Sequence, residues 1–154
     1  MSLTAACAKI ELILSDVDGV MTDGGIWHSD DGRQLVKFHI RDGMGIRLWR
    51  EAGKLFGIIT GRNLEAVRQR AADLKLDVLR QGVDDKLPVV DAIADELGLA
   101  REAICYVGDD LLDLPTIRAV GLVRSTPIQR SGRSPLCGGA PPRPAPLLTT
   151  RQKP

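Results

Sequence analysis

The sequence has few of the residues that mark several common classes of protein. Only three of its 154 residues are cysteines, Cys7, Cys105 and Cys137, and they form no CxxC pair. Without a nearby histidine cluster they predict neither a structural zinc site nor a disulfide framework. There is no run of about 18 apolar residues, and the N-terminus lacks the basic and apolar regions of a signal peptide. We therefore expect a cytoplasmic protein that does not enter a membrane.

An excess of charge of either sign is also missing. The chain has 21 Lys and Arg residues against 20 Asp and Glu residues, a formal net charge of +1. This balance favours neither nucleic acid nor an anionic membrane surface as a partner. With 44% hydrophobic residues, the length fits one globular domain with a sizeable core. We expect the partner to be a small molecule.

Acidic residues are absent from the segment 124–154, which contains six basic residues and seven of the nine prolines. The first 123 residues therefore carry 15 basic and 20 acidic residues. A Pro-rich segment without hydrophobic periodicity buries too little apolar surface to offset its ordering entropy. We interpret residues 1–123 as the folded domain and 124–154 as an atypical, mostly irregular tail. The abrupt loss of acidic residues favours a shifted reading frame over an evolved segment, a hypothesis that resequencing and intact-mass measurement test.

Short apolar runs alternate with helical patterns along the first 123 residues. The apolar runs predict strands at 10–15, 55–60, 77–79, 103–107 and 120–123. Helices are predicted from Asp42 to about Ala52, from Asn63 to about Leu74, around Pro88 until Gly98, and after Asp110 until Arg118. This alternation predicts an α/β fold with three layers, in which a Rossmann-like parallel sheet carries helices on both faces.

The segment 25–40 interrupts this pattern and predicts a β-hairpin. Residues 26–28 and 35–38 flank the turn Ser29–Gly32. The apolar side chains are more than a two-stranded ribbon can bury by itself, namely Ile26, Trp27, Leu35, Val36 and Phe38. Either the hairpin packs against other subunits, or one of its faces packs on its own sheet. We expect His28 at the hairpin surface and His39 in a packing role.

Polar residues follow the predicted strands at the points where these end. They are Asp16 and Asp18 after the first strand, Thr60 to Arg62 after the second, Lys86 after the third, and Asp109 and Asp110 after the fourth. In parallel sheets the carboxyl ends of the strands form the binding edge, so we expect these side chains to gather there. Each aspartate alone is typical of a helix cap or a turn. Their ordered combination favours a functional site.

The same residues resemble the four motifs of the haloacid dehalogenase superfamily. The DxDGV motif is matched by residues 16–20, the hydroxyl motif by Thr60, the lysine motif by Lys86 and the GDDxxD motif by residues 108–113. The stretch DVDGVMTDGGIW, followed by FHIRDGMGI, IITGR and QGVDDK, is similar to the 3-deoxy-D-manno-octulosonate 8-phosphate phosphatase family. The resemblance covers about residues 9–123, with the small hairpin in the place of a cap domain.

This resemblance implies a phosphatase that depends on Mg²⁺. Asp16 would attack phosphorus and form an aspartyl-phosphate, and Asp18 would protonate the leaving oxygen and then activate water. Thr60 and Lys86 would bind the phosphoryl oxygens, where charge builds up in the transition state. The ligands of Mg²⁺ would be the Asp16 carboxylate, the Asp18 backbone carbonyl and the Asp109 carboxylate. The remaining implied roles are support of the site by Asp110 and Asp113, and substrate contact by Gly61 and Arg62.

The resemblance also implies a substrate and an assembly. The substrate would be a sugar-acid phosphate of lipopolysaccharide biosynthesis, 3-deoxy-D-manno-octulosonate 8-phosphate, and the hairpins would join four copies into a homotetramer. A sialic-acid-type 9-phosphate or another small metabolite is an alternative substrate. A catalytically inactive scaffold is an alternative function. A receiver-type signalling domain would also bind Mg²⁺ and carry a phosphorylated aspartate, but it has no use for an acid/base partner such as Asp18.

Overall fold

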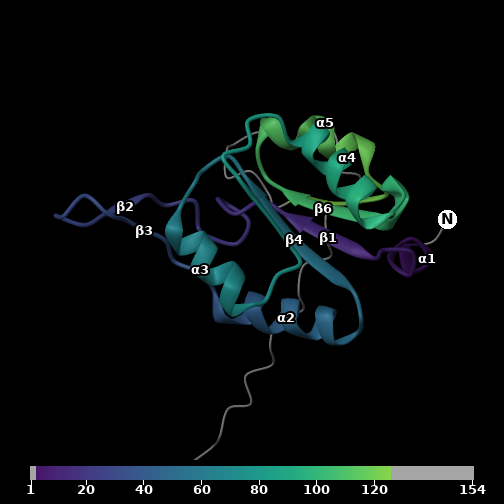
Figure 1. Ribbon diagram of the computed structural model, residues 1–154, viewed down its shortest axis with the longest axis horizontal. Coiled ribbons are helices and arrows are strands. Elements are labelled where there is room, and N and C mark those ends of the chain that lie inside the picture. Colours follow the sequence, from purple (N-terminus) through teal and green to yellow (C-terminus); the bar gives the residue numbers. More distant parts are fainter. Residues whose placement is uncertain (1–2, 126–154) are drawn as a thin grey trace, which may run out of the picture.

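A five-stranded parallel sheet forms the centre of the protein (Figure 1). The computed structural model describes residues 3–125, so residues 126–154 of the predicted tail lie outside the described residues. The strand order is β5-β4-β1-β6-β7, and each neighbouring pair is parallel. The strands are β1 (Leu12–Ser15), β4 (Leu55–Thr60), β5 (Val78–Gln81), β6 (Ile104–Gly108) and β7 (Leu122–Ser125).

Helices cover both faces of this sheet, which confirms the predicted three-layer α/β fold. In Figure 1, α2 (Ile40–Glu51) and α3 (Glu65–Asp73) lie on one side of the sheet, and α4 (Lys86–Leu97) and α5 (Leu114–Ala119) lie on the other. The described chain also contains α1 (Leu3–Cys7) and the short 3₁₀ helices η1 (Arg101–Ala103) and η2 (Leu111–Asp113). Among the described residues, no helix is both long enough and apolar enough to cross a bilayer.

Each face of the sheet buries its own apolar cluster. On one face Val90 of α4 packs with residues of β1, β4 and β6, and on the other Ile46 of α2 packs with β4 and with α3. Ile58 and Ile59 are neighbours in β4 but belong to opposite clusters, as the alternation of side chains in a strand requires. Burial on both faces explains why the central strands read as continuous apolar runs.

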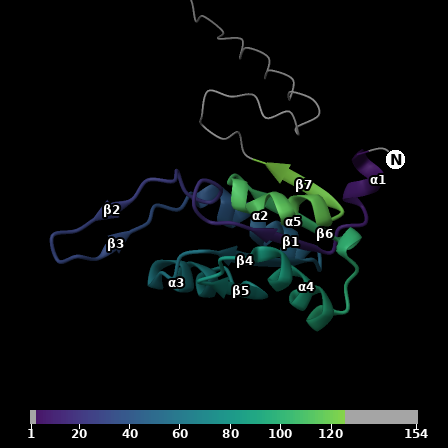
Figure 2. The ribbon, with the colours of Figure 1, turned by 90° about the horizontal axis from the view of Figure 1, so that it is seen from above.

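The predicted hairpin is present, and Figures 1 and 2 show it extending away from the sheet. Its paired strands, β2 (Trp27–His28) and β3 (Gln34–Leu35), are shorter than predicted. The turn is confirmed, because the Gly32 N–H donates to the Ser29 carbonyl at 2.9 Å. Ile26, Trp27 and Leu35 are 63%, 59% and 54% exposed, so they do not pack on the sheet of their own chain. Phe38 does pack against the apolar cluster below the sheet.

Two predicted helix caps are wrong. Helix α2 begins at Ile40, two residues before the predicted cap Asp42, and its cap is the exposed His39, whose Nδ1 accepts from the Arg41 N–H at 3.1 Å. His39 therefore has no packing role. Helix α3 begins after Leu64 instead of Asn63. The Leu64 N–H is already bound by the side-chain oxygen of Gln81, the last residue of β5, at 2.7 Å.

The last strands and helix also differ in their bounds from the prediction. Strand β5 lies at 78–81 instead of 77–79, because Asp77 turns its carboxylate to the Phe56 N–H. The helix predicted after Asp110 is split into η2 and α5. Strand β7 lies at 122–125 instead of 120–123, since the Gly121 N–H is held by the Arg101 carbonyl before pairing with β6 begins. The sheet thus takes in two residues of the predicted tail.

Candidate active site

The candidate site lies where the order of the strands reverses. From the central strand β1 the chain builds β4 and β5 on one side, and it then returns to build β6 and β7 on the other. Helices that leave in opposite directions open a crevice at such a switch point, beyond the carboxyl ends of the strands. Asp16 directly follows β1, and Asp109 directly follows the adjacent β6. The predicted gathering of Asp16, Lys86 and Asp109 is therefore present.

A buried lysine joins two of the carboxylates. The Lys86 Nζ lies 2.7 Å from the Asp16 Oδ2 and 2.6 Å from the Asp113 Oδ1. Lys86 is 5% exposed, Asp16 7% and Asp113 0%. The first residue of α4 thus delivers a positive charge to the end of β1, and the low local dielectric makes this charge more effective than it would be in water.

Asp113 is held by four donors. Its Oδ1 accepts from Lys86 and from the Tyr106 hydroxyl at 2.8 Å, and its Oδ2 accepts from the backbone N–H groups of Asp109 and Asp110, both at 3.1 Å. A single carboxylate therefore fixes both the lysine and the start of the loop after β6. Tyr106 was not identified from the sequence. A usable signal was present, because a tyrosine inside a buried strand needs a partner for its hydroxyl.

The environment shifts the pKa values of these groups. Burial raises the pKa of Asp16 above its ordinary value, although Lys86 and the Val17 N–H lower it. Burial lowers the pKa of Lys86, but the hydrogen bonds and charges of Asp113 and Asp16 outweigh burial, and the pKa is raised. Burial, together with the charge of Asp113, also raises the pKa of Tyr106, so that its hydroxyl stays protonated as a donor.

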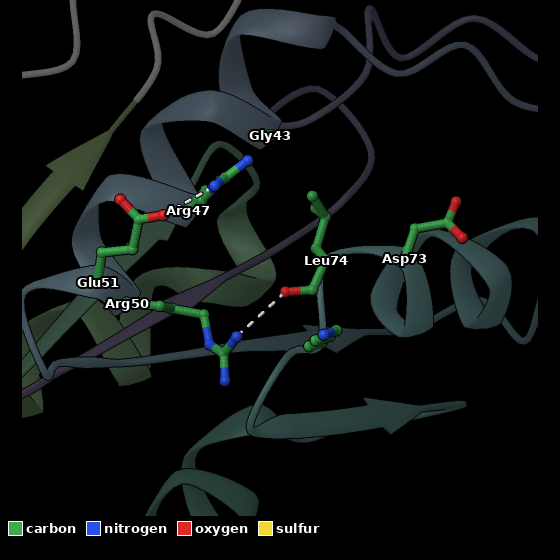
Figure 3. A pocket seen from close by; sticks show the side chains of 7 residues that line it. Gly43, Arg47, Arg50, Glu51, Asp73 and Leu74 are labelled. Carbon is green, nitrogen blue, oxygen red and sulfur yellow. Dashed lines mark hydrogen bonds and ion pairs between the residues drawn. The ribbon is translucent and has the colours of Figure 1, made fainter.

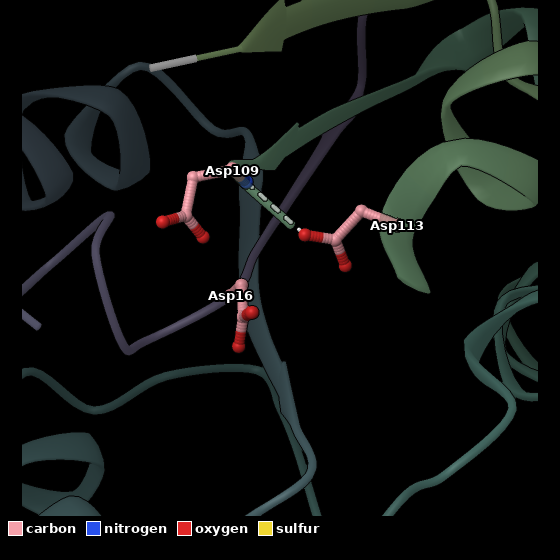
Figure 4. Close-up of side chains that lie close together, drawn as sticks. All are labelled: Asp16, Asp109 and Asp113. Carbon is pink, nitrogen blue, oxygen red and sulfur yellow. Dashed lines mark hydrogen bonds between the residues drawn. The ribbon is translucent and has the colours of Figure 1, made fainter. Parts of the chain in front are cut away.

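Asp109 is the second carboxylate at the switch point and faces Asp16 (Figure 4). Burial raises its pKa, and the negative charges of Asp16, Asp113 and Asp110 raise it further. Among the side chains that the structure describes, those of residues 4–122, no cationic group forms an ion pair with it. The chain at Gly19 passes directly against this carboxylate: with φ at +78°, an added Cβ would lie 1.9 Å from the Asp109 Oδ2. Only glycine fits there, which explains the glycine of the DxDGV motif.

The donor set fits a hard divalent cation. One oxygen each of Asp16, Asp109 and Asp113 lies within 4.8 Å of the others. Since Asp113 is committed to Lys86, Tyr106 and two backbone donors, Asp16 and Asp109 are the carboxylates that could hold an ion. Mg²⁺ takes oxygen ligands and keeps several waters, so two carboxylates and one backbone carbonyl suffice.

The side chain of Asp18 is placed apart from this cluster. Its Oδ1 accepts from the Arg62 Nη1 at 2.9 Å, and both side chains are about 30% exposed. The Arg62 Nη2 donates in turn to the side-chain oxygen of Gln34 at 2.7 Å, which reaches the site from strand β3 of the hairpin. The sequence contains no signal for this contact of Gln34.

The remaining predicted residues lie at or just after the carboxyl ends of β4 and β6. Thr60, at the end of β4, is 1% exposed, and its Oγ1 accepts weakly from the Arg62 N–H at 3.4 Å, while Gly61 is exposed. The Asp110 carboxylate turns back to the Leu111 N–H at 2.5 Å and, together with Asp113, forms a capping box. Asp110 therefore stabilises the loop and does not join the acidic cluster.

A groove of about 560 Å³ lies elsewhere, between α2 and the end of α3 (Figure 3). It shares no residue with the acidic cluster. Three of its charged side chains have partners, since Arg47 binds Glu51 at 2.7 Å and Arg50 binds the Leu74 carbonyl at 3.3 Å and also Asp77. The crevice at the switch point, and not this groove, contains the groups suited to chemistry. The groove is lined by Gly43, Arg47, Arg50, Glu51, Asp73, Leu74 and Lys75.

Comparisons with known proteins agree with this geometry. No protein-family model matches the chain. Over 118 residues the chain is 41% identical to the 3-deoxy-D-manno-octulosonate 8-phosphate phosphatase KdsC of Escherichia coli, a match that covers 77% of this chain and 63% of that protein. The chain thus spans less than two thirds of the length of this curated relative.

Two solved structures are similar in fold as well. A 3-deoxy-D-manno-octulosonate 8-phosphate phosphatase from Yersinia pestis is 39% identical, with a TM-score of 0.77, over 79% of this chain and 65% of that one. The enzyme of the same description from Moraxella catarrhalis, solved in complex with magnesium ion, phosphate ion and a KDO molecule, is 34% identical, with a TM-score of 0.74. That match covers 78% of this chain and 71% of the other.

Proposed function

The chain belongs to the 3-deoxy-D-manno-octulosonate 8-phosphate phosphatase family of the haloacid dehalogenase superfamily, and on this premise we propose that it is a magnesium-dependent phosphatase of a sugar-acid phosphate. The observation that carries the proposal is the buried Lys86, 2.7 Å from Asp16 and beside Asp109 at the switch point. A nucleophile, a fixed positive charge and an oxygen site for a cation thereby meet within a few ångströms.

Asp16 acts as the nucleophile. One of its carboxylate oxygens attacks phosphorus, the bond from phosphorus to the leaving oxygen breaks, and the phosphoryl group is transferred to Asp16. Lys86 and Thr60 bind the phosphoryl oxygens, on which negative charge is spread in the transition state. Asp113 keeps Lys86 in place throughout, because its four donors leave it no freedom to rotate.

Asp18 acts as the general acid and then as the general base. In its protonated form it gives one proton to the leaving sugar oxygen as the bond to phosphorus breaks, and the resulting carboxylate then accepts a proton from the water that attacks the aspartyl-phosphate. The second step releases inorganic phosphate and restores the Asp16 carboxylate. The ion pair with Arg62 sets the direction of the Asp18 carboxylate in the absence of substrate.

The Asp16 and Asp109 carboxylates and the Asp18 backbone carbonyl would hold Mg²⁺. When bound, the ion neutralises the phosphoryl oxygens and the repulsion between the two carboxylates, and so allows an anionic substrate to approach. The raised pKa of Asp109 supports this assignment, since the negative charges of Asp16, Asp113 and Asp110 all disfavour its ionised form until a cation binds.

The proposed substrate is 3-deoxy-D-manno-octulosonate 8-phosphate, and the alternative is a sialic-acid-type 9-phosphate. Both are sugar-acid phosphates, and the partly exposed guanidinium of Arg62 beside Asp18 offers a contact for an anionic substrate. We also propose that the exposed apolar residues of the hairpin join copies of the chain into a tetramer.

A substrate panel tests this function. Phosphate release is measured from both sugar acids and from simple sugar phosphates, with Mg²⁺ or EDTA, for the wild type and for Asp16→Asn, which keeps the size of the side chain. We expect turnover that needs Mg²⁺, is greatest with 3-deoxy-D-manno-octulosonate 8-phosphate, and is lost in the variant. Folded wild-type protein without turnover on any substrate would instead support an inactive scaffold.

A further inference from the structure

The hairpin touches the candidate site through the side chain of Gln34. Figures 1 and 2 show the hairpin extending away from the sheet, yet the Gln34 side-chain oxygen lies 2.7 Å from the Arg62 Nη2. The same guanidinium contacts Asp18 through its other terminal nitrogen, Nη1, at 2.9 Å. Three segments that are far apart in the sequence, namely the loop after β1, strand β3 and the loop after β4, thus meet at one arginine.

The backbone of Arg62 makes two long hydrogen bonds, whereas the position of its side chain depends on the two acceptors Asp18 and Gln34. The Arg62 N–H is directed to the Thr60 Oγ1, and the Arg62 carbonyl accepts from the Gly82 N–H, both at 3.4 Å. The guanidinium itself is 29% exposed. Because a guanidinium is planar, bonds at both Nη atoms fix its orientation and not only its distance from Asp18.

We propose that Gln34 is a positioning residue for the reaction: it orients Arg62, which in turn orients the Asp18 carboxylate toward the leaving oxygen. This inference rests on the proposed function, in which Asp18 is the acid. Through Gln34 the hairpin contributes to the reaction at the site of its own chain. A displacement of β3 would release one side of Arg62 and so disturb Asp18.

The nature of the leaving group separates this role from a general structural one. A sugar alkoxide is strongly basic and must be protonated as it leaves, whereas 4-nitrophenolate leaves with little help from an acid. A residue that orients the acid should therefore matter for the sugar phosphate and hardly at all for 4-nitrophenyl phosphate. A residue that only maintains the fold would affect both substrates equally.

The test measures kcat and KM on both substrates for Gln34→Ala, Gln34→Glu and the wild type. We expect Gln34→Ala to lower kcat for the sugar phosphate about 3- to 10-fold, the size of effect of one lost, partly exposed hydrogen bond. It should leave kcat for 4-nitrophenyl phosphate within about twofold of the wild type. Gln34→Glu keeps an acceptor for Arg62 and should retain the activity. Arg33→Ala is the matched control, because Arg33 lies next to Gln34 but contacts the hairpin residue Asp31.

A double-mutant cycle checks that Gln34 acts through Arg62. In an Arg62→Ala background, the further change Gln34→Ala should have no additional effect. Additive losses, equal losses on both substrates, or a Gln34→Ala variant equal to the wild type would overturn the inference. If the wild type has no phosphatase activity, the proposed function fails instead. NMR signals of the Arg62 guanidinium still test the contact in that case, and they should report restricted rotation that Gln34→Ala abolishes.

Discussion

Asp109 differs from the other two carboxylates of the cluster in its charged surroundings. This difference indicates a binding site for a cation and not an ordinary network of ion pairs. Asp16 and Asp113 share the positive charge of Lys86, while the Asp109 carboxylate faces other carboxylates. A protein without a use for this arrangement has no reason to keep a partly buried carboxylate against other carboxylates, because their repulsion destabilises the fold. When a cation binds, it neutralises the repulsion between the Asp109 and Asp16 carboxylates, and both can then bind the ion.

Substitution of Asp109 tests this interpretation through stability. The pKa of Asp109 is raised above its ordinary value of 3.8. In the metal-free protein its contribution to stability is therefore fully present below pH 3.8 and is lost as the pH rises through the raised pKa. In EDTA, Asp109→Asn should consequently be at least as stable as the wild type at pH 7, as measured by urea unfolding.

Mg²⁺ should reverse that order. At about 100 times its dissociation constant it should stabilise the wild type by about 2.7 kcal/mol, and Asp109→Asn hardly at all. The exposed Asp95 provides the control, since Asp95→Asn should keep the full response to Mg²⁺. A wild type whose unfolding does not respond to Mg²⁺ would contradict the assignment of the cation site.

At the scale of elements, the carboxylate of Asp77 connects helix α2 with strand β4 of the sheet. It accepts two bonds from Arg50 of α2, at 3.0 and 3.1 Å, and one from the Phe56 N–H of β4 at 2.9 Å, just before β5 begins. Arg50 also binds the Leu74 carbonyl at the end of α3. This network joins the end of α2 and the end of α3 to the sheet.

We predict that Asp77→Asn destabilises the protein by about 1–3 kcal/mol at pH 7, as expected for lost bonds to a charged group. Burial raises the pKa of Asp77, but Arg50 and the Phe56 N–H outweigh burial, and the pKa is lowered below 3.8. The contribution is thus present above pH 3.8 and is lost as the pH falls through the lowered pKa, so the two proteins should converge in acid. Urea unfolding at several pH values measures the difference.

Asp31→Asn is the matched control for this experiment. The pKa of Asp31 is also lowered, by the Ser29 hydroxyl and the Arg33 N–H, but its ion pair with Arg33 is exposed on the hairpin. Exposed pairs contribute little, so this variant should unfold like the wild type. An Asp77→Asn effect no larger than that of Asp31→Asn would show that the network does not hold the elements together.

The positions of the strands could be predicted from the sequence, whereas the starts of two helices could not. The strands and the gathering of Asp16, Lys86 and Asp109 were predictable, because apolar runs define buried strands and parallel strands end at one edge. The starts of α2 and α3 were not, since the cap His39 is not among the usual capping residues, and the Leu64 N–H is satisfied by a distant glutamine. Contacts made through tertiary structure leave no local pattern.

For the whole molecule, the exposed apolar surface of the hairpin is the main feature that a single chain does not explain. Ile26, Trp27 and Leu35 are more than half exposed on a ribbon that is only marginally stable by itself. We predict that the wild type is a tetramer by light scattering, and that Trp27→Asp together with Leu35→Asp yields monomers. Leu97→Asp, an exposed apolar residue at the end of α4, should not change the mass. A wild-type monomer would contradict this assembly.

The central claim is that Asp16 takes up the phosphoryl group, and acid quenching followed by mass spectrometry tests it most directly. Excess protein is mixed with 3-deoxy-D-manno-octulosonate 8-phosphate and Mg²⁺ and quenched during the first turnover, and the peptides are then analysed. We predict one phosphoryl group on Asp16 in the wild type and none in Asp16→Asn. Phosphate released without any phosphorylated Asp16, or sustained turnover by Asp16→Asn, would contradict the account.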